Sequence, residues 1–502
     1  MLTRWLRPRD LLPAPGHDGK KRLRGAGAAL IAVVVAGACG TSTATPTASG
    51  SANPTPWPTG SAGPTAWPSP SQSPSEGPTP LTTQDPSGKF AIALGKAGLL
   101  APAADAGRLA GTEINDFGFD LLRRLDPTGN LCASPTSIAL ALAMVRPGAL
   151  GLTATEMDKV MHDFGSTGQA AEIVALLKAL ESQTEYDDSG WSSNDPAATP
   201  DHTGKQPIAE LDVSNAAFAQ KGMSRQQAYL DSLSSGFGAG LGLLDYKNDP
   251  EGARQIINKW ASDRTKGRIP AVLQPGDVDT MTRLALANAI YLKAAWASQF
   301  DPSATKSLPF TRGDGSQVSV PTMAADRTLA YSAGTGYRAV VLPLGSAGLS
   351  MTIVVPDSMA SFMTGLTAAK LAGIDGAAQK YDVDLTLPRF SAETRVDLAS
   401  VLAAMGMPTL FDPHAADLSG ITTVEKLYVA KVIHQANIDV VEQGVTATAV
   451  TVVSIRAGSA GPVATPPHVQ FHVNKPFLYF IREESTGVVL FMGRIDDPSA
   501  KS

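Results

Sequence analysis

The stretch Lys475-Pro-Phe-Leu-Tyr-Phe-Ile-Arg-Glu-Glu-Ser-Thr-Gly-Val-Val-Leu-Phe-Met-Gly-Arg494 is apolar and aromatic except for a short polar break in its middle. Aromatic and β-branched residues are enriched in strands, so this composition predicts strand structure from Phe477 to Met492. Such a long apolar segment near the end of a 502-residue chain indicates a large sheet inside a sizeable core.

Two kinds of pattern lie upstream of that stretch. Helical periodicity in the first third predicts helices over 117–125, 137–144, 153–161 and 170–180. Alternating or apolar runs predict strands over 284–292, 339–342, 350–355, 383–387 and 427–438. Because these elements follow no regular strand–helix–strand rhythm, we expect an α+β fold with large, mostly antiparallel sheets. The polar stretch 182–205 is expected to be a surface insertion.

Several longer motifs occur in a fixed order between Asp116 and Pro498. They are Cys132-Ala-Ser-Pro-Thr-Ser137-Ile, Leu211-Asp-Val-Ser-Asn-Ala216, Ile257-Asn-Lys-Trp-Ala-Ser-Asp-Arg-Thr-Lys-Gly-Arg-Ile269, Ala287-Asn-Ala-Ile-Tyr-Leu-Lys-Ala-Ala-Trp296 with Phe300-Asp-Pro, Leu427-Tyr-Val-Ala-Lys-Val-Ile-His434, and the C-terminal stretch quoted above. Together they resemble the serpin family over nearly the whole folded region. The resemblance implies helices around a large mixed five-stranded central sheet, two further sheets and an exposed reactive loop.

The same resemblance implies a function. A serpin is a serine-type endopeptidase inhibitor, not an enzyme, and it needs no cofactor. Its reactive loop is cleaved by the target protease, inserts as a strand into the central sheet and traps the covalent acyl-protease. The loop corresponds to about residues 442–467 of this chain, with a hinge formed by Glu442, Gln443, Gly444, Val445, Thr446, Ala447, Thr448 and Ala449.

The loop has the composition that insertion requires. Gly444 supplies conformational freedom at the hinge. Side chains alternate between the two faces of a strand, so Val445, Ala447, Ala449, Thr451 and Val453 are expected to face the core. These residues are small or β-branched and uncharged, and none is proline, which suits a strand. Gln443, Val445, Thr446 and Thr448 depart from the commonest family residues but remain compatible with a strand.

The cleaved bond has two candidates. Counting from Gly444 as in the family places it at Gly458–Ser459, which implies a subtilisin- or elastase-like target. The side-chain chemistry instead favours Arg456–Ala457, because arginine suits a trypsin-like pocket. We favour Gly458–Ser459, with Arg456–Ala457 as the alternative. A serine protease is the expected partner and a cysteine protease the other candidate.

Other residues match supporting positions of the family. Ser134, Ser137, Asn288 and His434 correspond to a buried polar cluster beneath the point where the sheet opens, and buried polar groups there must be hydrogen-bonded to one another. Trp296 corresponds to the tryptophan near the loop's first insertion point. Routine core packing is the alternative interpretation of these residues.

The N-terminal part has a different character. A basic cluster, Lys20-Lys21-Arg22-Leu23-Arg24, precedes an apolar run from Gly25 to Ala38, which is too short to span a bilayer. This layout is typical of a secretory leader, and Ala36-Gly37-Ala38-Cys39 resembles a bacterial lipobox, in which the cysteine is lipidated. Plain secretion and an uncleaved anchor remain alternatives.

We therefore expect a leader with lipobox at 1–38, a disordered Ser/Thr/Pro/Gly-rich tether at 39–87 and the serpin domain at 88–502. The expected product is a monomeric lipoprotein on the surface of a Gram-positive bacterium, contacting the membrane through its lipid at Cys39 alone.

Other classes of function lack support in the sequence. The net charge of −5 gives no general attraction to nucleic acid. There is no Gly-x-Ser-x-Gly turn of a serine hydrolase, and segment 170–182 holds a single lysine, which argues against activation by polyanions.

Cys132 is expected to be a buried structural thiol. His468 and His472 would lie about 13 Å apart on a strand, so this pair is not expected to bind a metal ion. A non-inhibitory serpin that binds or chaperones other proteins is the competing function.

Overall fold

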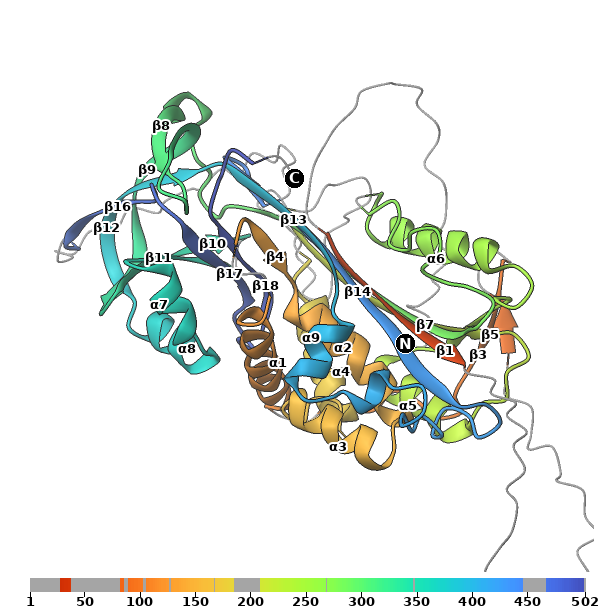
Figure 1. The fold of residues 1–502 in the computed structure, drawn as a ribbon. Coiled ribbons are helices and arrows are strands. Elements are labelled where there is room, and N and C mark those ends of the chain that lie inside the picture. The colour runs from red at the N-terminus through yellow and green to blue at the C-terminus, as the bar shows by residue number, and fades with distance from the viewer. Residues whose placement is uncertain are drawn as a thin grey trace, which may run out of the picture.

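The computed structural model describes residues 28–37, 82–84, 89–102, 105–125, 128–166, 168–184, 208–267, 269–345, 348–445 and 466–500. Helices gather beneath one large sheet, and a second large sheet extends to the side (Figure 1). The expected α+β fold is confirmed. The two smaller sheets anticipated beside the central one are joined in the described structure, because the long strand β9 (Gln317–Gly334) pairs along its length with β8, β12 and β10.

Within the described residues, the central sheet contains nine strands. Its middle consists of β14 (Leu427–Val441), β7 (Thr282–Ala295) and β5 (Ala209–Gln220), and β13 (Phe390–Asp397) pairs with the outer side of β14. Four short strands complete it: β6 (Leu241–Leu244), β3 (Ala91–Ala93), β2 (Thr82–Gln84) and β15 (Gly444–Val445). The ninth strand, β1 (Ala28–Gly37), lies between β14 and β7.

Strand β7 explains why the central sheet must be covered on both faces. Leu284, Leu286 and Ile290 belong to the main hydrophobic core, whereas the alternating residues Ala285 and Ala287 belong to a second core. Since successive side chains of a strand point to opposite faces, both faces of β7 are buried. Helix α6 (Pro250–Arg264) covers one face, and the cluster of N-terminal helices covers the other (Figure 1).

Of the five N-terminal helices in the described chain, four correspond to the periodic segments of the sequence, and the fifth, Gln227–Phe237, was not predicted. They are α1 (Ala106–Leu122), α2 (Pro135–Val145), α3 (Gly151–Val160), α4 (Ala170–Glu181) and α5 (Gln227–Phe237). Helix α2 is buried along its whole length, and the Ser134 side chain caps it by accepting a hydrogen bond from the Ser137 backbone N–H. Helix α1 begins eleven residues before the predicted start at Phe117, because its first turns continue the same buried face.

The second sheet also contains nine strands in the part of the chain that the structure describes. In spatial order they are β16 (His468–His472), β12 (Gln379–Pro388), β9, β10 (Tyr337–Leu344), β11 (Leu349–Pro356), β17 (Phe477–Glu483), β18 (Val489–Ile495) and β4 (Leu131–Ala133), with β8 (Lys306–Thr311) on β9. The predicted strand from Phe477 to Met492 is thus two strands. The Glu483 carboxylate accepts from the Ser485 and Thr486 backbone N–H groups and closes the turn between them.

Short helical segments complete the described structure. They are α7 (Met359–Thr364), α8 (Ala368–Gly376) and α9 (Ala399–Met405), with 3-10 turns at Arg146–Gly148, Pro302–Ala304 and Thr409–Phe411. In the part of the chain that the structure describes, no helix is long and apolar enough to cross a membrane.

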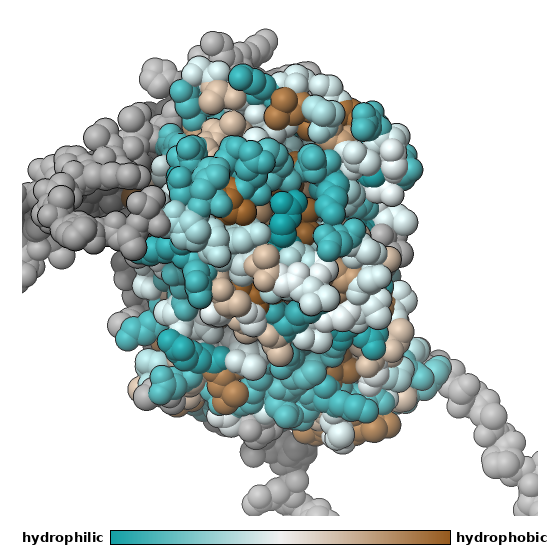
Figure 2. All heavy atoms as spheres, turned by 90° about the vertical axis from the view of Figure 1, so that its left-hand side faces the viewer, coloured by the Kyte–Doolittle hydropathy of each residue, from teal (hydrophilic) through white to brown (hydrophobic). Residues whose placement is uncertain are grey.

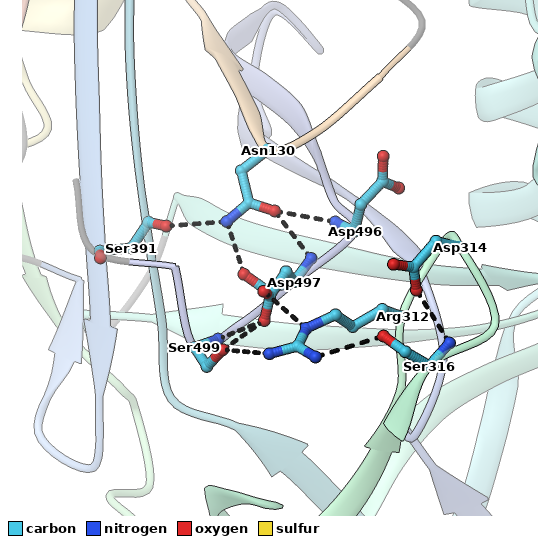
Figure 3. Close-up of polar contacts among 8 residues, drawn as sticks. All are labelled: Asn130, Arg312, Asp314, Ser316, Ser391, Asp496, Asp497 and Ser499. Carbon is cyan, nitrogen blue, oxygen red and sulfur yellow. Dashed lines mark hydrogen bonds and ion pairs between the residues drawn. The ribbon is translucent and has the colours of Figure 1, made fainter. Parts of the chain in front are cut away.

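A polar network fixes the C-terminal segment onto the second sheet (Figure 3). The Asn130 side-chain oxygen accepts from the backbone N–H groups of Asp496 and Asp497, both at 2.9 Å. Arg312 Nε donates to Asp497 Oδ2 at 2.7 Å, and its Nη2 donates to the Ser499 hydroxyl. These bonds join the residue before β4, the residue after β8 and the C-terminal segment, so two distant parts of the chain hold that segment in place.

Candidate functional site

The hinge enters the central sheet at its upper end, where β14 turns back as β15. Val445 pairs with Val440 of β14 and with Ala294 of β7, and Gly444 pairs with Val441 and Ala295. The Val445 side chain is 2% exposed and joins the main core. The first two residues after the turn are therefore already a strand between the two longest strands of the sheet.

The position of Gly444 requires a glycine. Its φ of +148° lies in a region that residues with side chains rarely adopt. A Cβ built there would lie 2.1 Å from the Ala294 carbonyl oxygen and 2.7 Å from the Ala295 Cα, both rigid backbone atoms. The close approach of the β14–β15 turn to β7 thus depends on the missing side chain.

Glu442 anchors the turn. Its side chain is 3% exposed and pairs with Arg389, whose Nε donates to the carboxylate at 2.7 Å. The Thr305 hydroxyl donates to the same carboxylate oxygen, and the Glu442 carbonyl accepts from the Phe300 backbone N–H at 3.0 Å. Burial acts to raise the pKa of Glu442, but the hydrogen bonds from Arg389 and Thr305 outweigh it and hold the pKa below its usual value.

Trp296 packs directly against this turn. The indole is 1% exposed, and its Nε1–H donates to the Val441 carbonyl at 2.8 Å. The Trp296 backbone N–H donates to the Gln443 carbonyl at 3.0 Å. The Phe300 ring meets the indole edge-on at 5.9 Å between centroids. Trp296 therefore contacts the hinge through hydrogen bonds on both sides of Glu442, besides being part of the core.

The remainder of the loop lies outside the described residues. This applies to the hinge positions Thr446, Ala447, Thr448 and Ala449, and to both candidate cleavage sites, Gly458–Ser459 and Arg456–Ala457. The lipidation candidate Cys39 and most of the expected tether also lie outside them. The described chain resumes at Pro466, just before β16.

Strand β1 occupies the space between β14 and β7 below β15. Ala29 pairs with Ala436 and Ile290, and Val33 pairs with Val432 and Leu286, antiparallel to both neighbours. This segment is the apolar part of the sequence that was expected to be a secretory leader. Strands β14 and β7 are therefore separated by the width of one strand over this length, and the ten-residue β1 fills that gap.

Ser134, Ser137 and His434 come together where α2 begins beneath β14. The Ser134 backbone N–H donates to His434 Nε2 at 3.2 Å, and all three residues are fully buried. Burial lowers the pKa of His434 to about 3, so its imidazole is neutral at ordinary pH. Its Nδ1 has no hydrogen-bond partner among the described groups. The fourth candidate, Asn288, lies on β7 opposite Asn215 and Ile31, and its side chain is outside the described set.

Two residues that sequence reasoning missed are Arg389 and Thr305. Arg389 follows β12 and Thr305 precedes β8, and both reach Glu442 from distant parts of the chain. Neither belongs to a recognisable motif, and only the folded arrangement brings them to the hinge. By contrast, Cys132 is fully buried as expected, and burial raises the pKa of its thiol to about 12.

Comparison with known proteins agrees with this arrangement. A family model described as "Serpin (serine protease inhibitor)" matches residues 112–498. The leukocyte elastase inhibitor of Xenopus tropicalis is 34% identical over 394 residues, covering 76% of this chain and 97% of the relative. The human leukocyte elastase inhibitor is 32% identical and human serpin B13 is 31% identical, with the same coverage.

A solved structure shows the same fold. The crystal structure of the thermophilic serpin tengpin in the native state superposes with a TM-score of 0.65 at 23% identity, covering 80% of this chain and 97% of tengpin. The matched residues include the whole hinge, the buried cluster around His434 and the strands on both sides of the gap. This chain belongs to the serpin family of serine protease inhibitors.

Proposed function

We propose that this protein inhibits a serine protease by the insertion mechanism: the loop is cleaved, becomes a strand between β14 and β7, and carries the acyl-protease with it. The observation that supports this most directly is β15. Val445 is already seated in register between Val440 and Ala294, so insertion would extend an existing strand.

The register of that extension follows from β15. Val445 pairs with residue 440 of β14. Because this pairing is antiparallel, an extended strand would pair residue 449 with residue 436. On the other side, Val445 faces residue 294 of β7, so residue 449 faces residue 290. Ala436 and Ile290 are the present partners of Ala29. The inserted loop and strand β1 would therefore occupy the same place.

The loop composition favours such a strand. With Val445 in the core, Ala447, Ala449, Thr451 and Val453 follow on the same face. Each is small or β-branched, and no charge or proline interrupts them. This supports an inhibitory serpin over a non-inhibitory one.

A serine protease is the proposed target. Relatives named leukocyte elastase inhibitor support this class, and cleavage at Gly458–Ser459 suits a subtilisin- or elastase-like enzyme. Cleavage at Arg456–Ala457 would instead select a trypsin-like enzyme. A cysteine protease remains the other candidate.

One gel experiment tests the proposal. The chain beginning at Cys39 is incubated with subtilisin, elastase and trypsin in parallel, and the products are separated in SDS. We expect a stable complex with at least one protease and a released C-terminal peptide, whose mass identifies the cleaved bond. Cleavage without a complex across a broad panel of proteases would contradict trapping and support the non-inhibitory alternative.

We also propose that the protein is a bacterial surface lipoprotein acting as a monomer. The supporting features are the basic cluster before Gly25, the apolar run, and Cys39 following Ala36-Gly37-Ala38. Expression in a Gram-positive host tests it: the protein is expected in the membrane fraction with a lipid mass on Cys39, and Cys39→Ala is expected to release it. An unmodified Cys39 in secreted protein would favour plain secretion.

A further inference from the structure

Two aspartate side chains and one histidine side chain meet on the exposed face of the second sheet, next to β16, the edge strand that follows the loop. Ligand atoms of Asp326, Asp382 and His468 all lie within 4.8 Å of one another. They come from three adjacent strands, β9, β12 and β16. His468 Nδ1 and Asp382 Oδ2 are 3.4 Å apart.

The strand register explains why these side chains share a face. Asp382 pairs directly with His468 in the parallel β12–β16 ladder, and Asp326 pairs with residue 384 in the antiparallel β9–β12 ladder. Along β12 the alternating residues Val383 and Leu385 are fully buried, so Asp382 points to the outer face. Hydrophilic side chains predominate over the upper part of this end of the molecule (Figure 2).

We propose that Asp326, Asp382 and His468 bind a divalent transition-metal ion, with Zn²⁺ the best match. Two carboxylate oxygens and one imidazole nitrogen are ligands that Zn²⁺ takes at about 2.0–2.2 Å, with water completing a four-coordinate site. Ligands of such a site lie about 3.4 Å apart. The separation of His468 Nδ1 and Asp382 Oδ2 already has that value, and all the ligand atoms lie within 4.8 Å of one another.

The surrounding charges favour a cation. Asp384 and Lys380 flank Asp382 two positions away on the same strand, and His472 Nε2 lies 3.6 Å from Asp384 Oδ2. When the imidazoles are neutral, this face carries the three negative charges of Asp326, Asp382 and Asp384 and the one positive charge of Lys380. Its net charge is then negative. His468 and His472 do not share an ion, because each faces a different aspartate. The proposed site therefore differs from the two-histidine site that the sequence argued against.

A metal ion at this site would hold β16, the strand into which the loop leads, against the neighbouring strands. Within the described residues, β16 pairs with β12 alone, by five parallel residue pairs, and it begins directly after the loop. An ion held by His468, Asp382 and Asp326 ties β16 to the two strands inside it. The loop would then be fixed at its entry by the Glu442–Arg389 pair and at its exit by the metal.

Zinc titration of the full chain tests this inference. Isothermal titration of the wild type with ZnCl₂ at pH 7.5 is compared with His468→Ala and Asp382→Asn, and His472→Ala serves as the matched control on the same strand. We expect one site whose affinity falls at least about tenfold in the first two variants and stays unchanged in the control. Absence of zinc binding, or equal losses in His468→Ala and His472→Ala, would overturn the site.

Hydrogen exchange gives a second readout that does not depend on inhibition. Zn²⁺ is expected to slow amide exchange at Val469–Phe471 in the wild type and in His472→Ala, but not in His468→Ala. Calcium, which prefers more numerous oxygen ligands, is expected to have little effect. Equal protection in all three proteins would place the bound zinc elsewhere and contradict the proposal.

Discussion

Gly444 approaches Ala294 so closely that any Cβ at residue 444 would lie 2.1 Å from the Ala294 carbonyl oxygen. Gly444→Ala is therefore expected to destabilise the β14–β15 turn by about 1–3 kcal/mol, through this clash and the unfavourable φ. Chemical denaturation measures the loss. Gly336→Ala is the control, because Gly336 also has a positive φ but open space around it. Equal losses in both variants would show that close approach to β7 is unimportant.

The ion pair at the hinge predicts a coupling between two substitutions. Arg389→Ala leaves the carboxylate of Glu442 almost buried with one fewer partner, and we expect a loss of about 1–3 kcal/mol in unfolding free energy, reduced because Arg389 is itself 42% exposed. Adding Glu442→Gln removes the unpaired charge and is expected to restore part of that loss. Lys259→Ala, in an exposed helical pair, is the control and should change stability little. Strictly additive effects of the two hinge substitutions would contradict the coupling.

His434 predicts a pH dependence of stability. Its pKa is about 3 in the folded protein and about 6.5 when unfolded, so below pH 6.5 the unfolded state binds a proton that the folded state does not. Stability therefore falls as pH falls, by about 1.4 kcal/mol per pH unit between those values.

Glu113 has the opposite effect on stability. Burial and the charge of Glu172 raise its pKa to about 7 in the folded protein, so the folded state binds a proton more readily and gains stability as pH falls. To isolate the contribution of His434, the unfolding free energy of His434→Asn is subtracted from that of the wild type, at pH 7.5 and at pH 5.5. We expect the difference to decrease by about 1.4 kcal/mol at the lower pH. A constant difference would mean that His434 titrates normally in the fold.

Strand β1 predicts that the N-terminal segment and the cleaved loop compete. A chain beginning at Cys39 lacks Ala28–Gly37 and leaves the gap between β14 and β7 for the loop. Cleavage of its loop is expected to raise the melting temperature, whereas cleavage of the full chain should raise it much less. Val33→Asp in the full chain places a charge in β1 and should behave like the deletion. Identical responses of all three proteins would contradict competition for one gap.

Much of the fold was predictable because its elements carry periodic patterns. The alternation in 284–292 and the apolar spacing in 137–144 identify β7 and α2, and the order of motifs identifies the family. The turn at Glu483 was missed because one polar break inside an apolar run does not reveal how its carboxylate bonds.

The partners of Glu442 could not be predicted for a different reason. Arg389 and Thr305 reach it from 53 and 137 residues away, and no local pattern encodes such a contact. The pairing of Ala28–Gly37 was also missed, because an apolar run suits a leader and a central strand equally well. The candidate metal ligands lie on three strands, so their meeting depends on a register that the sequence alone does not specify.

The central claim is that the cleaved loop becomes a strand with alternate residues in the core. The most direct test compares Ala447→Arg with Thr448→Arg in the chain beginning at Cys39, measuring the fraction of protease trapped as SDS-stable complex. Residue 447 follows Val445 on the buried face and residue 448 faces away, so Ala447→Arg is expected to be cleaved without trapping, while Thr448→Arg traps like the parent chain. Equal trapping by both variants, or equal loss, would contradict insertion in this register.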